Sequence, residues 1–490
     1  MDNMILISAI VQYIEAHVKE KIEYEDLEKS TGTSYRYIRQ LFPEYSHVTL
    51  ARYVNSRKIA NAAFEIVHSN KDITDIAMDY GFAAYDTFTR VFKRHTGQTP
   101  NNFRKSNITV KTTLIAVGMY APVLSKDINL FSSERIADLA GDGNILFGVP
   151  KVEYSSGKCV PFAACLESTL KYIGHKYRHH YAYIMAACGA AFRLRWNDAK
   201  WDAANVDLRN MNSENPYEAY INSFNAVGID YSILAREDST KEEFINRIVN
   251  SLDNGIPVIG LGIVGPPEAC IITGYNHKGE MLYGWSYFQD NPEFTKDVAF
   301  LDNGYFSTSA WWDNPFSTHL FILGQPFCPL RRTEDIIENA YRILTMSATG
   351  EYLAGLNAYE GWAKSLQDDD FFSSGSITPI LLESIFCQGD AETMIGEGRY
   401  WASEFFKEVA NEDKRMAPLC NETAKLFEQI SSCGQKMTEI RGGANLDRQM
   451  IEKFLNSETR KALVKIIYQA KEYEAAAIKK IEKCSLEFTL

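Results

Sequence analysis

The hydrophobic pattern changes twice along the chain. Over the first hundred residues, apolar positions recur at helical spacing. In the middle, continuous apolar runs bounded by glycine favour buried strands at 255–262, 269–275 and 281–285. From Arg332 onward, helical spacing returns and persists to the end. This pattern predicts a multidomain chain: an all-α N-terminal region at 1–106, a linker at 107–150, an α+β middle domain at 151–330, and a helical C-terminal region at 331–490 that packs on the middle domain.

Composition narrows the class of protein. The 490 residues are 46% hydrophobic and 23% charged, which is ordinary for a globular protein and excludes a disordered chain. A net charge of −12 excludes a protein that is basic overall. Residues 1–105 hold 14 Lys and Arg against 13 Asp and Glu, so a near-neutral head precedes an acidic body. Because we find no apolar span of ~18 residues, no basic N-terminal leader and no CxxC pair among nine cysteines, we expect a cytoplasmic protein with reduced thiols.

Residues 24–42 show the pattern of two short helices joined by a tight turn. Gly32 permits the left-handed turn, and Thr33 is expected to cap the second helix through its hydroxyl. The buried side of that helix is marked by Ile38, Leu41 and Phe42. Its opposite side carries Arg36, Arg39 and Gln40. These side-chain types pair with base edges in the major groove of DNA.

The same plan recurs at 72–95. Asp72 is placed to cap a helix that ends at Gly81, and a second helix follows from about Tyr85 to His95. That helix is expected to bury Phe88, Val91 and Phe92 and to expose Tyr85, Asp86, Arg90 and Lys93. Between the two units, a helical pattern of about 21 residues would be roughly 31 Å long. One turn of DNA is ~34 Å, so the two second helices could enter successive major grooves on one face.

These residues resemble the AraC/XylS-type DNA-binding domain over about residues 5–106. The resemblance rests on 73–82 (ITDIAMDYGF), on 88–93 (FTRVFK) and on 97–104 (GQTPNNFR). It implies base-facing positions for Arg36, Arg39, Gln40, Tyr85, Asp86 and Arg90. Two departures stand out: Pro43 is expected to end the first of these helices early, and Asp86 would repel phosphate unless it accepts from a cytosine amino group. A helical module that binds only protein is the alternative.

Cys165 is expected to open a helix, and the glycine-bounded strands at 255–262 and 269–275 follow far downstream. This order resembles the papain-like fold of bacteriocin-processing peptidases and, more closely, the butirosin-type acyltransferase domain, whose nucleophile opens such a helix. The resemblance implies a His where this chain has Glu268, and an Asp near 284–286, where it has Gly-Trp-Ser. A glutamate cannot act as the imidazolium partner of a thiolate. We therefore expect no enzymatic activity; the alternative is a Cys-dependent acyltransferase or amide hydrolase using Cys165 and His277.

In place of a catalytic site we expect a pocket for a small-molecule effector. It is formed by Cys165, Trp196, Glu268, Trp285 and Tyr287. We expect no cofactor and no metal, since the adjacent pair His179-His180 cannot converge on one ion. The sequence thus predicts a one-component transcription regulator of AraC/XylS type. Its head binds double-stranded DNA, and its body senses an unknown small molecule or mediates dimerisation. RNA polymerase and a second copy of the chain are the further partners we expect; a body that makes only protein contacts is a third interpretation.

Overall fold

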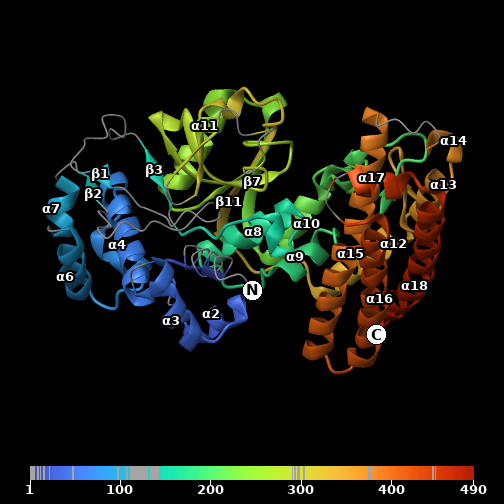
Figure 1. Ribbon diagram of the computed structural model, residues 1–490, viewed down its shortest axis with the longest axis horizontal. Coiled ribbons are helices and arrows are strands. Elements are labelled where there is room, and N and C mark those ends of the chain that lie inside the picture. Colours follow the sequence, from blue (N-terminus) through green and yellow to red (C-terminus); the bar gives the residue numbers. More distant parts are fainter. Residues whose placement is uncertain are drawn as a thin grey trace. The chain divides into compact units, whose positions relative to one another are not determined.

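The structure is a computed structural model (Figure 1). It describes residues 17–20, 22–46, 49–96, 99–105, 143–146, 148–289, 304–372, 378–443 and 448–489, together with the isolated positions 6, 7, 10, 13, 14, 109, 110, 131, 132, 291, 294, 298–301 and 446. Most of the predicted linker lies outside the described residues. Within that range, β1 (Thr109–Val110) pairs with β2 (Phe131–Ser132). No helix among the described residues is long and apolar enough to cross a membrane.

The chain forms two compact units. Unit 1 comprises Met1–Glu153, Ser168–Gly174 and Tyr231–Leu323, and unit 2 comprises Tyr154–Glu167, His175–Asp230 and Gly324–Leu490. The predicted ranges for the head and the C-terminal region each fall in one unit, whereas 151–330 is shared between both. The chain passes between them inside α8 (Pro161–Tyr172), β5 (Ile229–Ala235) and β11 (His319–Pro326). A helical head, a sheet-containing middle region and a helical C-terminal region together make a multidomain chain.

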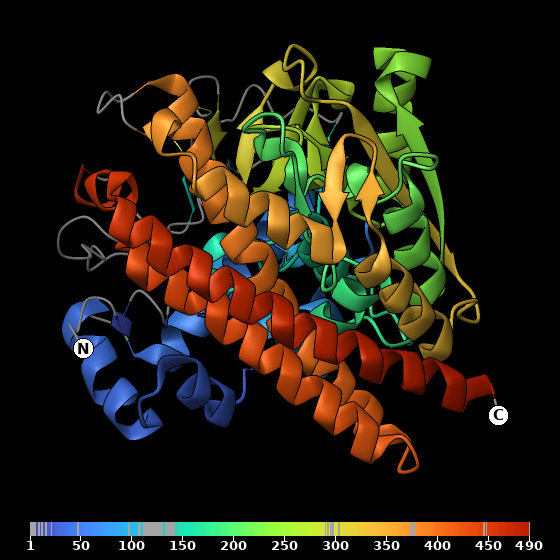
Figure 2. The ribbon, with the colours of Figure 1, turned by 90° about the vertical axis from the view of Figure 1, so that its right-hand side faces the viewer.

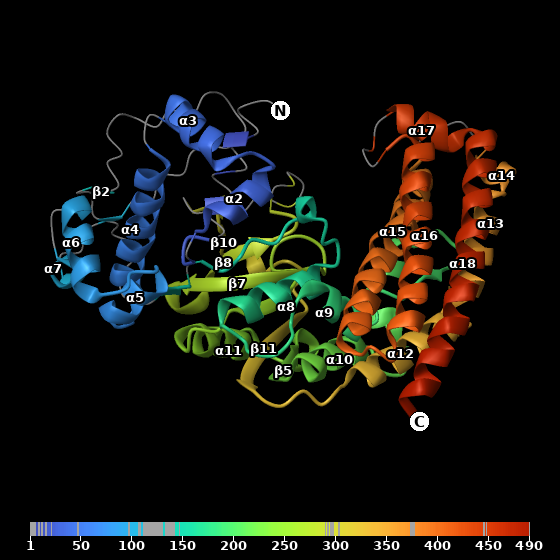
Figure 3. The same ribbon diagram turned by 90° about the horizontal axis from the view of Figure 1, so that it is seen from below.

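The head of unit 1 is entirely helical between residues 22 and 105, in the part that the structure describes. Its helices, drawn in blue in Figures 1 and 3, are α2 (Tyr24–Thr31), α3 (Tyr35–Ser46), α4 (Leu50–His68), α5 (Ile73–Asp79), α6 (Tyr85–Thr96) and α7 (Pro100–Lys105). One predicted boundary is wrong: α3 continues through Pro43 to Ser46. A proline inside a helix removes one backbone hydrogen bond; the buried side chains of Leu41 and Phe42 hold the helix where that bond is lost.

The rest of unit 1 is built on a sheet whose strand order is β5-β11-β6-β7-β8-β10-β9, with β3 paired to β7. Its remaining strands are β3 (Asn144–Ile145), β6 (Val258–Leu261), β7 (Ala269–Asn276), β8 (Met281–Ser286), β9 (Ala299–Phe300) and β10 (Phe306–Thr308). The three predicted buried strands are thus present, and every residue of β7 is buried. Gly284 permits β7 and β8 to approach, since a Cβ there would meet the Ile271 carbonyl oxygen at 1.8 Å. Helix α11 (Lys241–Asp253) packs on β6 and β7.

Unit 2 is dominated by long helices. In Figures 2 and 3, α15 (Pro379–Glu412), α16 (Ala417–Arg441) and α18 (Ser457–Thr489) lie side by side. Gly396 and Gly434 let α15 and α16 come close, because a Cβ on Gly434 would lie 2.7 Å from the Gly396 Cα. Around them lie α9 (Tyr181–Ala187), α10 (Glu218–Val227), α12 (Thr333–Thr345), α13 (Gly355–Leu366), α14 (Asp369–Phe372) and α17 (Arg448–Leu455), and a small sheet of β4 (Arg195–Trp196), β12 (Ala348–Thr349) and β13 (Tyr352–Ala354).

Candidate nucleic-acid interface

The first helix-turn-helix unit is α2 and α3. Helix α2 ends at Gly32, whose φ of 63° is left-handed, as the sequence predicts. The cap of α3 differs from the prediction: Ser34, not Thr33, accepts from the backbone N–H of Tyr37 at 3.4 Å, because α3 begins at Tyr35. We call α3 the first reading helix. Its buried side and its exposed side are those expected, with Arg36, Arg39 and Gln40 all exposed.

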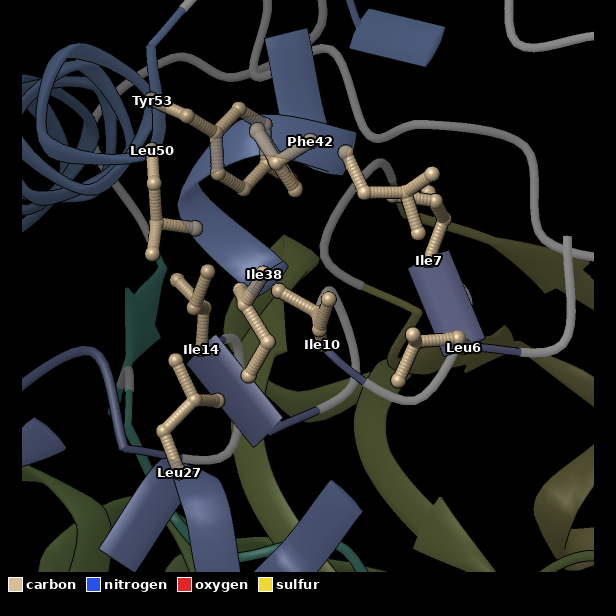
Figure 4. Packing of buried hydrophobic residues seen from close by; sticks show 10 residues of the cluster. Leu6, Ile7, Ile10, Ile14, Leu27, Ile38, Phe42, Leu50 and Tyr53 are labelled. Carbon is tan, nitrogen blue, oxygen red and sulfur yellow. The ribbon is translucent and has the colours of Figure 1, made fainter. Parts of the chain in front are cut away.

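A compact apolar cluster fixes the orientation of this reading helix (Figure 4). Ile38 and Phe42 of α3 point toward Leu27 of α2 and toward Leu50 and Tyr53 of α4. The cluster is completed by Leu6, Ile7, Ile10 and Ile14 of the N-terminal segment and by Leu41. Every member is 4% exposed or less. Since the core holds one side of α3, the opposite side is presented to solvent.

The second helix-turn-helix unit is α5 and α6, and we call α6 the second reading helix. Asp72 caps α5 by accepting from the N–H of Thr74 at 2.7 Å, and that hydrogen bond lowers the pKa of the Asp72 carboxyl. Gly81 follows with φ 75°. Phe88 and Phe92 of α6 are buried, and Val91, which was expected to be buried, is half-buried.

The side of α6 away from this core carries the predicted DNA-facing residues. Asp86, Arg90 and Lys93 are exposed. Tyr85 is half-buried, and its hydroxyl accepts from Asn101 Nδ2 of α7 at 3.2 Å. The exposed faces of both reading helices therefore combine guanidinium, ammonium, amide and carboxylate groups, the donors and acceptors that base edges and phosphates require.

Helix α4 connects the two helix-turn-helix units and is braced at its middle and toward its end. It has 19 residues, which corresponds to about 28 Å, close to the length expected. At its middle, the Lys58 ammonium donates to the carbonyls of Glu20 and Tyr80, at 2.9 and 3.1 Å. Toward its end, the buried Glu65 carboxylate accepts from the Tyr80 hydroxyl at 3.0 Å, and Arg104 of α7 donates to the Ile66 carbonyl at 2.9 Å. Such contacts make α4 a stiff spacer.

Comparison with known proteins identifies this head. A family described as a helix-turn-helix domain matches residues 27–106. The regulatory protein SoxS of Salmonella typhimurium is 32% identical over 104 residues, which are 21% of this chain and 97% of SoxS. The chain belongs to the AraC family.

Two further similarities cover a comparable share of the chain. The probable transcription factor PqrA of Proteus vulgaris is 31% identical over 103 residues, 21% of this chain and 84% of PqrA. A solved structure of a protein of unknown function from Listeria innocua is 30% identical, covers 20% of this chain and 91% of its own, and has a TM-score of 0.19, on which we base no argument. The AraC-type head thus makes the chain a DNA-binding transcription regulator, and the matched family ends where the head ends.

The predicted effector residues are divided between the two units. Cys165 and Trp196 belong to unit 2, whereas Glu268, Trp285 and Tyr287 belong to unit 1. Trp196 is buried, stacks on Trp362 and donates to the Ser365 hydroxyl at 2.9 Å. Trp285 is buried as well and donates to the Val149 carbonyl at 2.8 Å. Both indoles are thus engaged inside their own units, Tyr287 is buried, and Glu268 lies half-buried just before β7.

The predicted position of the cysteine is wrong. Helix α8 begins at Pro161, so Cys165 lies in its second turn and is fully buried instead of opening the helix. A proline at the first helical position was the signal for this earlier start. The thiol that precedes the helix is Cys159, whose backbone N–H donates to Glu397 Oε1 at 2.7 Å. Burial, and next the Glu397 carboxylate, raise the pKa of the Cys159 thiol to about 12.

His277 lies where the sequence places it, in the turn after β7. It is exposed, and its backbone N–H donates to Asn276 Oδ1 at 2.8 Å. His180, the second member of the adjacent pair, caps α9 and lies 3.1 Å from a Glu408 carboxylate oxygen. In the parts of the chain that the structure describes, no three His, Cys, Asp or Glu side chains are grouped as a metal would require.

Proposed function

We propose that the head binds a specific DNA sequence by placing α3 and α6 in successive major grooves. Arg36, Arg39 and Gln40 would contact bases in one groove, and Tyr85, Asp86, Arg90 and Lys93 would contact bases and phosphates in the next. The observation that carries this proposal is the shared geometry of the two helix-turn-helix units. Each reading helix buries one side in its core and exposes the predicted DNA-facing residues, except the half-buried Tyr85, on the other. The ~28 Å of α4 supports the one-turn spacing.

We further propose that the body, residues 107–490, is a sensing region for a small molecule or a dimerisation region, in a cytoplasmic one-component regulator. We interpret the middle region of this body as a papain-like, acyltransferase-like scaffold that has lost its catalytic activity. Two observations disfavour the enzymatic alternative. Cys165 is fully buried, and the raised pKa of the Cys159 thiol keeps it protonated near neutral pH, where the thiolate is the nucleophile.

The DNA-binding proposal is tested with the full chain. Its preferred duplex is selected from a random-sequence pool, and affinity is then measured by fluorescence anisotropy at one stated salt concentration. Arg39→Ala and Arg90→Ala should each weaken specific binding by ~1–3 kcal/mol, or about 5- to 150-fold. The matched control is Arg448→Ala, since Arg448 is equally exposed but lies in unit 2. Full affinity in both head variants would show that α3 and α6 do not contact the DNA.

A further inference from the structure

Two arginines are buried next to each other in unit 2. Arg193 and Arg195 lie two residues apart on the segment that leads into β4, and they are 7% and 2% exposed. Each of the two donates to a backbone carbonyl. Arg193 Nη1 donates to the Val206 carbonyl, and Arg195 Nη2 donates to the Asp207 carbonyl at 2.6 Å. Both carbonyls belong to one segment, the short helices η2 (Ala203–Val206) and η3 (Leu208–Met211) with Asp207 between them.

The charge of Arg193 has no carboxylate partner among the described residues. Its Nε is buried and makes no hydrogen bond there. The nearby Asp207 carboxylate is occupied by Arg209, whose Nε and Nη2 donate to it at 3.0 and 2.8 Å. A buried guanidinium ordinarily has an anionic partner, because removing an unpaired charge from water is costly.

Other buried arginines of unit 2 follow that rule. Arg399 is fully buried and donates from Nε and Nη2 to the Glu474 carboxylate. Arg441 donates from Nε and Nη2 to the Glu392 carboxylate, at 3.2 and 2.9 Å. The contrast sets Arg193 apart: it is buried like these two arginines but lacks the carboxylate that each of them has.

The electrostatics of the pair point the same way. Burial, and next the charge of Arg193, lower the pKa of Arg195 to about 9, so two positive groups repel each other inside the unit. Glu397 is a buried acid close enough for the charge of Arg193 to lower its pKa, although burial raises that pKa by more. Its Oε1 already accepts from the Cys159 N–H, the Tyr181 hydroxyl and Trp401 Nε1, at 2.7, 2.8 and 3.2 Å. The charge of Arg193 thus acts on Glu397, but the ion pairs of the described residues include none between the two side chains.

We propose that Arg193, reinforced by the charge of Arg195, binds an oxyanion: a carboxylate or phosphate group of a small ligand. The anion accepts from Arg193 Nε and Nη2 together, the two-pronged geometry that guanidinium offers to oxyanions. Nη1 lies on the opposite edge of the guanidinium, so its hydrogen bond to the Val206 carbonyl is compatible with the bound anion. This inference deepens the proposed sensing role of the body, because it assigns an anionic group to the effector. It rests on that role only for the purpose of the binding.

The test is thermal unfolding of the full chain with inorganic phosphate or with succinate, against sodium chloride at equal ionic strength. One of the two anions should raise the midpoint by roughly 2–4 °C at about ten times its Kd. Which one does so distinguishes a phosphate from a carboxylate ligand. Arg193→Gln should abolish the shift and leave the anion-free protein equally or more stable, since it removes an unpaired buried charge. Arg448→Gln should keep the shift, because Arg448 is exposed on unit 2 and has Glu452 as its partner.

Equilibrium dialysis of the unaltered protein with radiolabelled phosphate or succinate keeps the test decisive if Arg193→Gln does not fold. Absence of saturable binding of both probes in the millimolar range would overturn the proposal. It would also be overturned if Arg448→Gln and Arg193→Gln lost the response equally, because the effect would then be general charge. Neither experiment uses DNA, so their failure would leave the DNA-binding proposal standing.

Discussion

The two helix-turn-helix units of the head share a plan but present different charges to DNA. Helix α3 has no acidic residue in its first turn and exposes Arg36 and Arg39. Helix α6 has Asp86 in its first turn, ahead of Arg90 and Lys93. An acid near a helix N-terminus stabilises the helix but opposes a phosphate at the same place. We therefore expect the first helix-turn-helix unit to contribute more to DNA affinity and the second helix-turn-helix unit more to discrimination between DNA sequences.

The two helix-turn-helix units also differ in the side chains that pack against their reading helices. The first is packed mostly by aliphatic side chains around Ile38, whereas the second rests on a row of rings: Phe82, Phe88, Phe92 and Phe103, each with its centroid 5.1–5.3 Å from the next. Arg104 also fastens α7 to the carbonyls of Ile66 and Lys71, at 2.9 and 2.6 Å. The second helix-turn-helix unit, whose reading helix carries Asp86, is thus the one held by more extensive aromatic and polar contacts.

The largest effect is expected from breaking that row of rings. Phe88→Ala should destabilise the second unit by about 3–5 kcal/mol, because it removes a fully buried ring between Phe82 and Phe92. Urea unfolding of the full chain measures this cost. Thr87→Ala on the exposed side of α6 is the control and should change stability little. Equal stability of the two variants would show that the aromatic row does not hold α6.

A change that makes the first unit resemble the second sharpens the comparison. Gln40→Glu introduces an acid on the exposed face of α3. We expect binding to weaken roughly tenfold, about 1.4 kcal/mol, because the new carboxylate faces phosphates and base acceptors. Gln40→Met has nearly the same size without the charge and serves as the control. If both variants bound DNA equally, charge on α3 would not govern affinity.

The converse change removes the acid from the second unit. Asp86→Asn should tighten binding to random-sequence duplex by roughly threefold, since one repulsive charge is lost. It should also reduce discrimination at a single base pair by ~1–3 kcal/mol if the carboxylate accepts from a cytosine amino group. Competition binding against a library of single-base-pair variants measures both quantities. Weaker binding to random duplex would contradict this assignment of roles.

The smallest effect concerns the cap of α5. The pKa of Asp72 is lowered by its hydrogen bond with Thr74 N–H, so the cap stabilises the fold above the unfolded-state pKa of ~3.9 and is lost as pH falls through the lower folded value. Asp72→Ala should therefore lower the melting temperature slightly at pH 7, and the difference from the unaltered protein should shrink below pH 4. Asp72→Asn keeps the acceptor without the charge. Its stability should lack this pH dependence.

How much of the molecule follows from sequence depends on how local the interactions are. Gly32, Gly81, the Asp72 cap and the apolar spacing of Ile38 and Phe88 act within a few residues, and the structure places these where the pattern predicts. The boundary at Pro43 was wrong because packing of Leu41 and Phe42 outweighs one lost backbone hydrogen bond.

The body shows the opposite case. Cys159 meets Glu397 across 238 residues, and Arg399 meets Glu474 across 75. No local pattern encodes such contacts, so the buried arginines and the Cys159–Glu397 contact were not foreseen. One feature of the sequence did point to buried arginines. Arg193 and Arg195 are two charged residues inside an otherwise apolar run from 187 to 196.

The most direct test of the central claim is a hydroxyl-radical footprint of the full chain on its selected duplex, compared with Arg39→Ala and Arg90→Ala at protein concentrations that saturate each complex. The account predicts two protected patches about one helical turn, ~10 base pairs, apart on one face of the DNA. Arg39→Ala should weaken protection in one patch, and Arg90→Ala in the other. A single patch, or loss of the same patch in both variants, would contradict the claim that α3 and α6 enter successive major grooves.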